Sequence, residues 1–187
     1  MRKNFGARPY LYPQPVLIVA AYGEDGVANA MNAAWGGMIE SDKIAMCLGH
    51  RHKTVKNILE KGAFTVSTGT VSTVVSCDYV GIVSGNDEPN KIEKSGFTVT
   101  KSEFVNAPVI NELPMCIECK LISYDEESSQ LIGEIINVNA DESILTDGSI
   151  DNEKLQAISY DPVNHYYLKI GEIVGHAFEE GKKISEE

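Results

Sequence analysis

The chain has 187 residues, 43% of them hydrophobic and 23% charged, and its 27 acidic and 16 basic side chains leave a formal net charge of −11. A negative field of this size repels phosphate backbones and anionic lipid, which argues against nucleic acid or a membrane surface as a partner. The longest apolar runs fall far short of the roughly 20 residues that a bilayer crossing needs, and the composition is that of a folded globular protein.

A chain of this length normally folds around one core, so residues 1–187 are predicted to form a single domain. Polar residues and prolines interrupt the apolar stretch that a secretion signal near the N-terminus would need, and we expect a cytoplasmic protein. Four cysteines, Cys47, Cys77, Cys116 and Cys119, are too few and too irregularly placed for a disulfide scaffold, so free thiols are expected.

The first predicted elements form a hairpin. Val16–Tyr22 is apolar and rich in β-branched residues and leads into the turn Gly23–Gly26, after which Val27–Trp35 makes the second strand. Small residues alternate in this second strand with the amides of Asn29 and Asn32, and neither face is a plain hydrophobic stripe. Small side chains let a flat ligand lie close to a strand, and amides can pair with ring nitrogens and carbonyls. A ligand site and a tight strand crossing explain this pattern equally well.

A third strand is predicted at Lys43–Leu48, and a polar loop then leads into a helix. Thr54 stands at the N-cap or in the first turn of this helix, and Gly62 is placed to end it in a left-handed conformation. Arg51 and Thr54 therefore lie at a helix N-terminus, where free N–H groups and the helix dipole attract an anion. In a chain this acidic, the local positive charge favours a ligand phosphate over an ordinary solvated cap.

The second half of the chain again predicts short elements. Ala63–Ser67 is extended, Val71–Val83 is ambiguous between helix and strand with helix preferred, and Ile92–Gly96 is a short helix. Met115–Asp125 and Leu131–Ala140 predict two long strands of another hairpin. Hairpins with few helices and no βαβ alternation predict a mainly β protein, an antiparallel barrel. The chain has no glycine-rich dinucleotide loop, which argues against a Rossmann domain.

Cys116 and Cys119 have the spacing of a zinc or redox motif, but they fall within a predicted strand. Residues three apart on a strand point to opposite faces. Buried cysteines that behave as small apolar residues are therefore the favoured interpretation, and a zinc-binding protein is the third and weakest hypothesis.

Taken together, several segments resemble the flavin reductase-like family, particularly its flavoredoxin branch. The segments that carry the resemblance are Pro15–Val19, Asp25–Trp35, the run Arg51-x-x-Thr54-x-x-Asn57-Ile58 and Phe64–Val66, with weaker support from Ser84–Lys91, Gly133–Val138 and the glycine-containing tail. The resemblance implies an antiparallel Greek-key split β-barrel with a few short helices, in which two protomers form a homodimer and each binds one FMN.

The resemblance also assigns site residues to this sequence. Asn29, Met31, Asn32, Ala33 and Trp35 would line the isoalloxazine, Arg51, Thr54 and Asn57 would bind the ribityl phosphate, Lys91 would be the family's lysine near the flavin, and Tyr167 the aromatic residue beside the ring. No catalytic residue and no metal ligand is assigned. Asn139 stands where many members have a histidine, and an amide cannot titrate, so no proton-handling role is expected there.

The function implied is that of a flavin-dependent oxidoreductase of the NAD(P)H:flavin oxidoreductase type. Electrons would pass from NAD(P)H or an electron-carrier protein through bound FMN to a flavin, a metal chelate or a partner protein. A split barrel that binds flavin without turnover is the alternative. The sequence does not choose among the donors or the acceptors.

Overall fold

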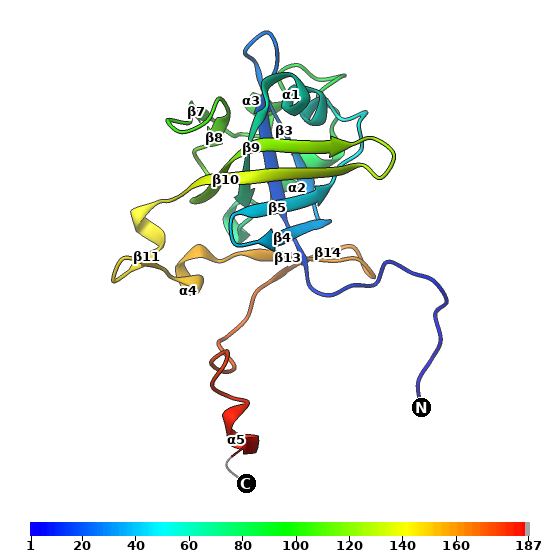
Figure 1. The fold of residues 1–187 in the computed structure, drawn as a ribbon, viewed down its shortest axis with the longest axis vertical. Helices are drawn as coiled ribbons and strands as arrows, with labels where there is room; N and C mark the ends of the chain where they lie inside the picture. The colour runs from blue at the N-terminus through cyan, green and yellow to red at the C-terminus, as the bar shows by residue number, and fades with distance from the viewer. Residues whose placement is uncertain (186–187) are drawn as a thin grey trace.

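A curled antiparallel sheet of seven strands forms the body of the molecule in this computed structural model, which describes residues 1–185 (Figure 1). The strands are β2 (Leu17–Tyr22), β3 (Ala28–Ala33), β4 (Gly36–Glu40), β5 (Lys43–Cys47), β6 (Ala63–Thr68), β9 (Met115–Asp125) and β10 (Gln130–Ala140), in the order β3-β2-β6-β9-β10-β5-β4. β3 and β4 stand at opposite ends of this order, although only Ala34 and Trp35 separate them in the chain. So short a connection spans about 11 Å at most, so the sheet must curl until its edges approach each other. The predicted mainly β split barrel is confirmed.

Both predicted hairpins are confirmed. β2 pairs with β3 from Leu17 opposite Ala33 to Tyr22 opposite Ala28. β9 and β10 pair along almost their whole length, with two irregularities in register. The strand β4 was not predicted, because a segment that opens with two glycines lacks the apolar alternation of a strand.

Two hydrophobic clusters lie on the two faces of the β2–β3 hairpin. Val19 and Ala21 of β2 belong to the cluster inside the barrel, whereas Ile18 and Ala20 belong to the cluster outside it. This division explains why β2 reads as a continuous apolar run: it is buried on both sides. Fully burying one such aliphatic side chain contributes roughly 1.5–3 kcal/mol.

Helix α1 (Lys53–Lys61) closes one end of the barrel. Its Val55 and Ile58 pack into the inner cluster. The helix ends at Gly62, whose φ of 66° is left-handed, so the predicted helix and its glycine stop are confirmed.

Helix α2 (Val74–Ile82) follows a short 3₁₀ turn at Val71–Thr73 and covers the outer cluster with Cys77 and Val80, which confirms the helical interpretation of this segment. The short helix α3 (Lys91–Lys94) begins one residue before the predicted one.

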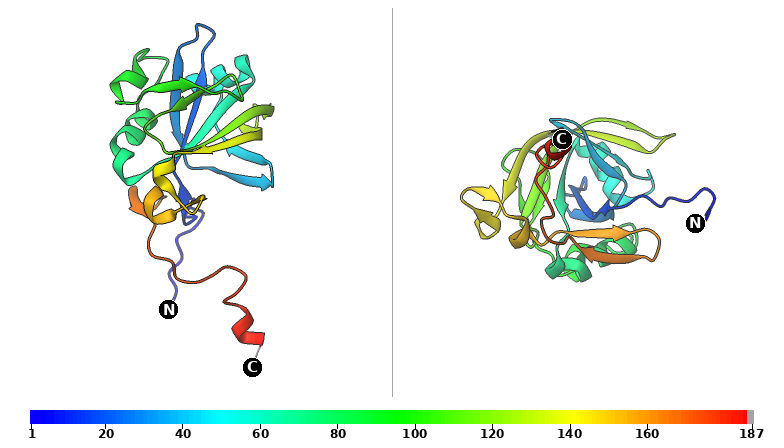
Figure 2. Two further views of the ribbon diagram at one scale, coloured as in Figure 1. Left: turned by 90° about the vertical axis from the view of Figure 1, so that its left-hand side faces the viewer. Right: turned by 90° about the horizontal axis from the view of Figure 1, so that it is seen from below.

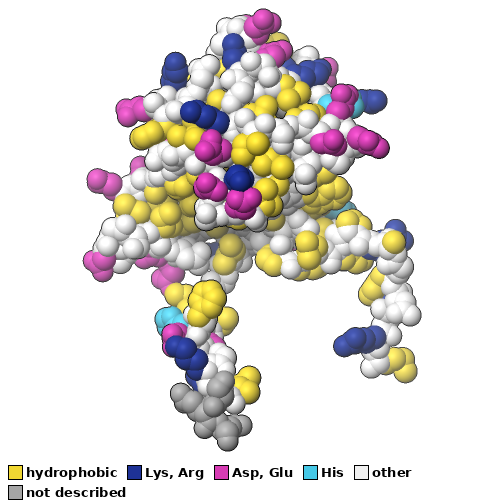
Figure 3. Space-filling view, viewed as in Figure 1, with side chains coloured by type: hydrophobic (Ala, Val, Ile, Leu, Met, Phe, Trp, Pro, Cys, Tyr) yellow, Lys and Arg dark blue, Asp and Glu magenta, His cyan; other side chains and the backbone are white. Residues whose placement is uncertain are grey.

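Smaller sheets flank the barrel. They comprise β1 (Gln14–Pro15) with β13 (Ile158–Asp161) and β14 (Tyr166–Lys169), β7 (Val99–Lys101) with β8 (Pro108–Ile110), and β11 (Leu145–Thr146) with β12 (Ser149–Ile150). Two further short helices are α4 (Asn152–Leu155) and α5 (Lys182–Ser185). Both terminal segments leave the body at the same end (Figure 2) and stand clear of it with apolar side chains exposed (Figure 3). Within residues 1–185, no helix has the length and apolar character that a membrane crossing requires.

Cys116 and Cys119 lie on β9, as expected, and both are buried and free. Cys119 packs in the inner cluster, whereas Cys116 lies opposite Ser67 of β6. Burial raises the pKa of Cys116 to about 11 and that of Cys119 to about 12, so both remain neutral thiols near pH 7. The described part of the chain holds no cluster of three or more His, Cys, Asp or Glu side chains placed to bind a metal ion.

Candidate functional site

A buried lysine marks the candidate site. Lys91, at the start of α3, is only 3% exposed. Its ammonium makes no hydrogen bond or ion pair with any residue among 1–185. Burial lowers the pKa of Lys91 to about 8. The Lys91 side chain lines a cavity of about 170 Å³, and its ammonium has no counter-ion there, so this cavity suits an anionic ligand.

The N-terminus of α1 opens into the same cavity through Lys53 and Thr54. The helix has no side-chain cap and no acidic residue in its first turn, so its first N–H groups and the positive end of its dipole face the cavity without a competing anion. Thr54 is fully buried, and its Oγ1 accepts a hydrogen bond from Asn29 Nδ2 at 2.7 Å. The proton of the Thr54 hydroxyl is thereby left to donate to a ligand. Anion-binding groups thus converge from three elements, α1, β3 and α3.

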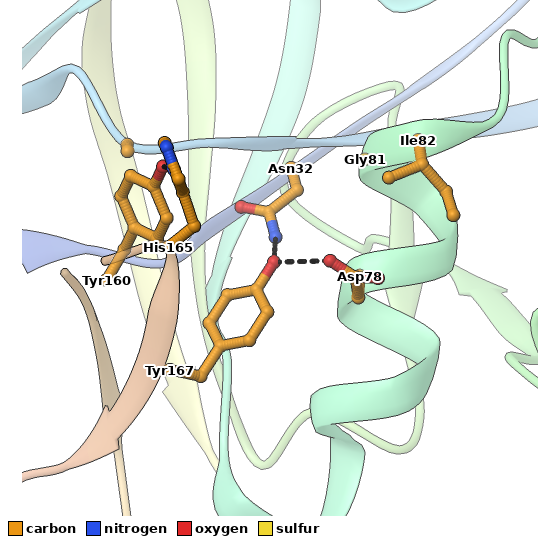
Figure 4. Close-up of a pocket in the computed structure, with 8 residues that line it drawn as sticks. Asn32, Asp78, Gly81, Ile82, Tyr160, His165 and Tyr167 are labelled. Atoms are coloured by element: carbon orange, nitrogen blue, oxygen red, sulfur yellow. Dashed lines mark hydrogen bonds between the residues drawn. The ribbon is translucent and has the colours of Figure 1, made fainter. Parts of the chain in front are cut away.

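A second cavity of about 330 Å³ adjoins the first, and the two share Asn32, Gly81 and Ile82 in their walls. Its other walls come from α2 and from the β13–β14 hairpin, with Asp78 on the helix and Tyr167 on the hairpin (Figure 4). Burial, together with a hydrogen bond to Asp78, raises the pKa of Tyr167 above its ordinary value. A ligand with an anionic end near Lys91 and a ring near Tyr167 would span both cavities.

The structure brings most of the expected site residues together. Asn29, Met31, Asn32, Thr54 and Lys91 line the first cavity, and Tyr167 lines the second. Asn32 belongs to both.

Four expected residues line neither cavity. Ala33 packs inside the barrel, and Trp35 is exposed beside the N-terminal segment. Asn57 is buried one turn further along α1, where its amide contacts the backbone of the β2–β3 hairpin. Arg51 is exposed, and it contacts the loop after α2 through its carbonyl, which accepts from Asn86.

Sequence reasoning missed several lining residues: His52, Lys53 and the segment 80–85 of the first cavity, and Asp78, Tyr160 and His165 of the second. The segment 84–91 did carry part of the resemblance, but its approach to β3 is long-range. No local pattern reveals that a hairpin near the C-terminus packs beside α2.

Of the glycines in the segment 80–85, Gly85 lies closest to β3. A Cβ at this position would lie 2.1 Å from Oδ1 and 2.7 Å from Cγ of Asn29. Asn29 is 7% exposed and bonded to Thr54, so it has little room to move.

We therefore expect Gly85→Ala to displace Asn29 from Thr54 and to weaken binding of an anionic ligand in this cavity by about tenfold, the effect of losing one or two hydrogen bonds. Titration with FMN, monitored by flavin fluorescence, measures this. Gly171→Ala is the matched control, since a Cβ there meets nothing within 4 Å. Equal affinities of the two variants would show that Gly85 does not shape the site.

Known proteins share the fold of this chain. The family model described as flavin reductase like domain matches residues 9–159. A solved structure, the flavoredoxin of Desulfovibrio vulgaris (Miyazaki F), is similar with 41% identity and a TM-score of 0.92, over 97% of this chain and 100% of that one. The flavoredoxin from Methanosarcina acetivorans is similar with 28% identity and a TM-score of 0.88, over 98% and 99% of the two chains.

A curated protein of Aquifex aeolicus, itself uncharacterized, is 24% identical over 173 residues, which cover 86% of each chain. The residues that the family model matches include the barrel strands and helix α2, and β3 and α2 line the two cavities. The chain therefore belongs to the flavin reductase like domain family.

Proposed function

We propose that this protein is an FMN-dependent oxidoreductase that passes electrons from NAD(P)H or an electron-carrier protein through bound FMN. The observation that carries the proposal is the largely buried Lys91 side chain, whose ammonium has no counter-ion among the described residues, in a cavity that also receives the N-terminus of α1. A phosphate is the group that such a set of donors prefers. The family supplies the second half of the argument, since its members are flavoproteins.

The residues present fit FMN. Its single terminal phosphate suits the one cluster of donors at α1 and α3, and the adjoining cavity beside Asn32 and Tyr167 is large enough to receive part of a flat ring. FAD carries a further nucleotide that would need a second anion site. An FMN-binding protein from Thermus thermophilus shares this fold, with a TM-score of 0.74 at 16% sequence identity.

FMN supplies the redox chemistry when bound, by accepting and releasing electrons at its ring system. The chain's own residues bind and orient it. The N–H groups of α1, the Thr54 hydroxyl and the Lys91 ammonium hold the anionic end, while the amide of Asn32 faces the adjoining cavity. The Lys91 cation also favours a ligand that becomes more negative on reduction, because opposite charges attract more strongly beside a cavity wall than in bulk water.

The test is rapid anaerobic mixing of the FMN-loaded protein with NADH, with NADPH and with a reduced one-electron carrier protein. The proposal predicts that at least one donor bleaches the visible flavin band about a hundredfold faster than it bleaches free FMN, as expected for a positioned cofactor. Bound flavin that no donor bleaches faster than free FMN would identify a binding module without turnover. A protein that binds no flavin would contradict the proposal altogether.

We also propose a homodimer. Trp35, Met38 and Ile39, at and beside the edge strand β4, are all more than half exposed. An apolar sheet edge of this kind is normally covered by a partner, and a second copy with twofold symmetry can cover it.

We expect light scattering to give twice the chain mass at micromolar concentration, and the double substitution Met38→Lys, Ile39→Lys to shift the protein toward monomer. The exposed pair Ile122→Lys, Val138→Lys, away from this edge, is the control. A wild-type monomer would contradict the proposal.

A further inference from the structure

Three elements that are distant in the sequence meet at Tyr167. The residue comes from β14, and it faces Asp78 of α2 and Asn32 of β3 (Figure 4). Tyr167 Oη donates a hydrogen bond to Asp78 Oδ1 at 2.8 Å, and Asn32 Nδ2 lies 3.4 Å from Tyr167 Oη. Gly81 lets α2 come this close, since a Cβ there would lie 3.0 Å from Asn32 Cβ.

The directions of these hydrogen bonds are fixed by chemistry. The carboxylate of Asp78 and the carbonyl of Cys77 can only accept, and Asn32 Nδ2 donates to that carbonyl at 3.1 Å. The phenol of Tyr167 therefore gives its proton to Asp78 and presents its oxygen to the amide N–H of Asn32. The amide oxygen of Asn32 accepts no hydrogen bond from any residue among 1–185 and is directed away from α2 into the cavity.

We propose that Asp78 is a positioning residue of the flavin site, which acts through Tyr167 to hold the phenol and the amide of Asn32 in this arrangement. Asn32 then offers an acceptor, so it meets a ligand edge that carries an N–H. A ring system with an imide or a reduced-ring N–H has such an edge, and a simple carboxylate or carbonyl compound does not. Without the Asp78 carboxylate, the Tyr167 hydroxyl has no hydrogen-bond acceptor in the cluster, because the atom of Asn32 that faces it is the donor Nδ2. The proposal rests on the proposed function.

A double-mutant cycle on FMN affinity tests the proposal. Asp78→Ala and Tyr167→Phe should each weaken FMN binding about tenfold. The double variant should bind FMN no more weakly than the single variant of lower affinity, because both substitutions remove the same hydrogen bond. Asp78→Asn keeps a carbonyl acceptor for the phenol and should bind FMN within about threefold of wild type.

Tyr12→Phe is the matched control for this cycle. It removes a tyrosine–aspartate bond to Asp161, beside the turn of the same hairpin, and Tyr12 lines neither cavity. It should leave FMN affinity unchanged. Additive losses in the double variant, or an Asp78→Asn variant as weak as Asp78→Ala, would overturn the proposal.

A second readout does not depend on FMN. In the apoprotein labelled with 3-fluorotyrosine, the fluorine resonance that is missing from Tyr167→Phe belongs to Tyr167. The change of its chemical shift with pH gives the pKa of the phenol. The pKa of the Tyr167 phenol should be higher than that of an exposed fluorotyrosine, and Asp78→Ala should lower it. A wild-type protein that binds no flavin yet shows this behaviour would contradict the proposed function and leave the Asp78–Tyr167 contact established. A titration that Asp78→Ala does not move would overturn the contact itself.

Discussion

Replacing Lys91 with methionine should weaken FMN binding by about a hundredfold. Methionine fills a similar volume but carries no charge, so the variant loses the charge-assisted hydrogen bonds that the ammonium would make with an anion in the cavity. Such bonds contribute roughly 1.5–3 kcal/mol each, and 1.4 kcal/mol corresponds to about a factor of ten in affinity. Isothermal titration of the flavin-free protein with FMN measures the loss.

Riboflavin and Arg51 supply the controls for this prediction. Riboflavin lacks the phosphate, so its affinity should fall much less in Lys91→Met than that of FMN. Arg51→Met removes an exposed cation outside the cavity and should change FMN affinity less than about threefold, because an exposed charge is screened by solvent. If Arg51→Met were the more damaging variant, the phosphate would lie at the loop before α1, as the family resemblance suggests, and Lys91 would have another role.

The same Lys91→Met substitution should stabilise the protein without flavin by about 1–2 kcal/mol at pH 7, less than the full pKa difference would give, because the ammonium faces a cavity where solvent screens its charge. Burial lowers the pKa of Lys91 from 10.5 to about 8, and every tenfold change in proton affinity corresponds to about 1.4 kcal/mol. Between these two pH values the unfolded chain binds more protons at this residue than the folded one. The destabilisation is therefore complete below about pH 8 and disappears as the pH rises toward 10.5.

Urea unfolding of both flavin-free proteins at several pH values checks this. The stability gain of Lys91→Met should be full at pH 7 and nearly absent at pH 10.5. The buried thiols of Cys116 and Cys119, whose raised pKa values lower stability at alkaline pH, act equally in both proteins and cancel in the difference. A constant difference across this range would mean that the folded protein does not lower the pKa of Lys91.

The sequence predicted those parts of the fold that local patterns determine. The β2–β3 and β9–β10 hairpins have apolar, β-branched strands with polar turns between them, and α1 has both a helical spacing and a glycine at its end. The edge strand β4 and the β13–β14 hairpin have neither. β13 pairs with β1, which lies far away in the chain, and such tertiary pairing leaves little trace in local propensity. β4 pairs with its neighbour β5, but its two glycines carry no strand propensity of their own.

The site was predictable to the extent that it lies on β3 and at the start of α1. Asn29 and Thr54 were both expected there, but that they bond each other follows only from the packing of α1 against the hairpin. The burial of Lys91 could not be read from its neighbours, because an isolated lysine in a turn-rich segment is normally exposed. Asp78 was missed for a related reason, since its partner Tyr167 lies 89 residues away.

A crystal structure of the protein soaked with FMN tests the central claim most directly, namely that the cavity between α1 and α3 is a flavin-phosphate site. Our account predicts the phosphate at the N-terminus of α1, within hydrogen-bond distance of the Thr54 hydroxyl and the Lys91 ammonium, with the ring extending past Asn32 toward Tyr167. A phosphate bound elsewhere, with Lys91 still unpaired, would contradict it.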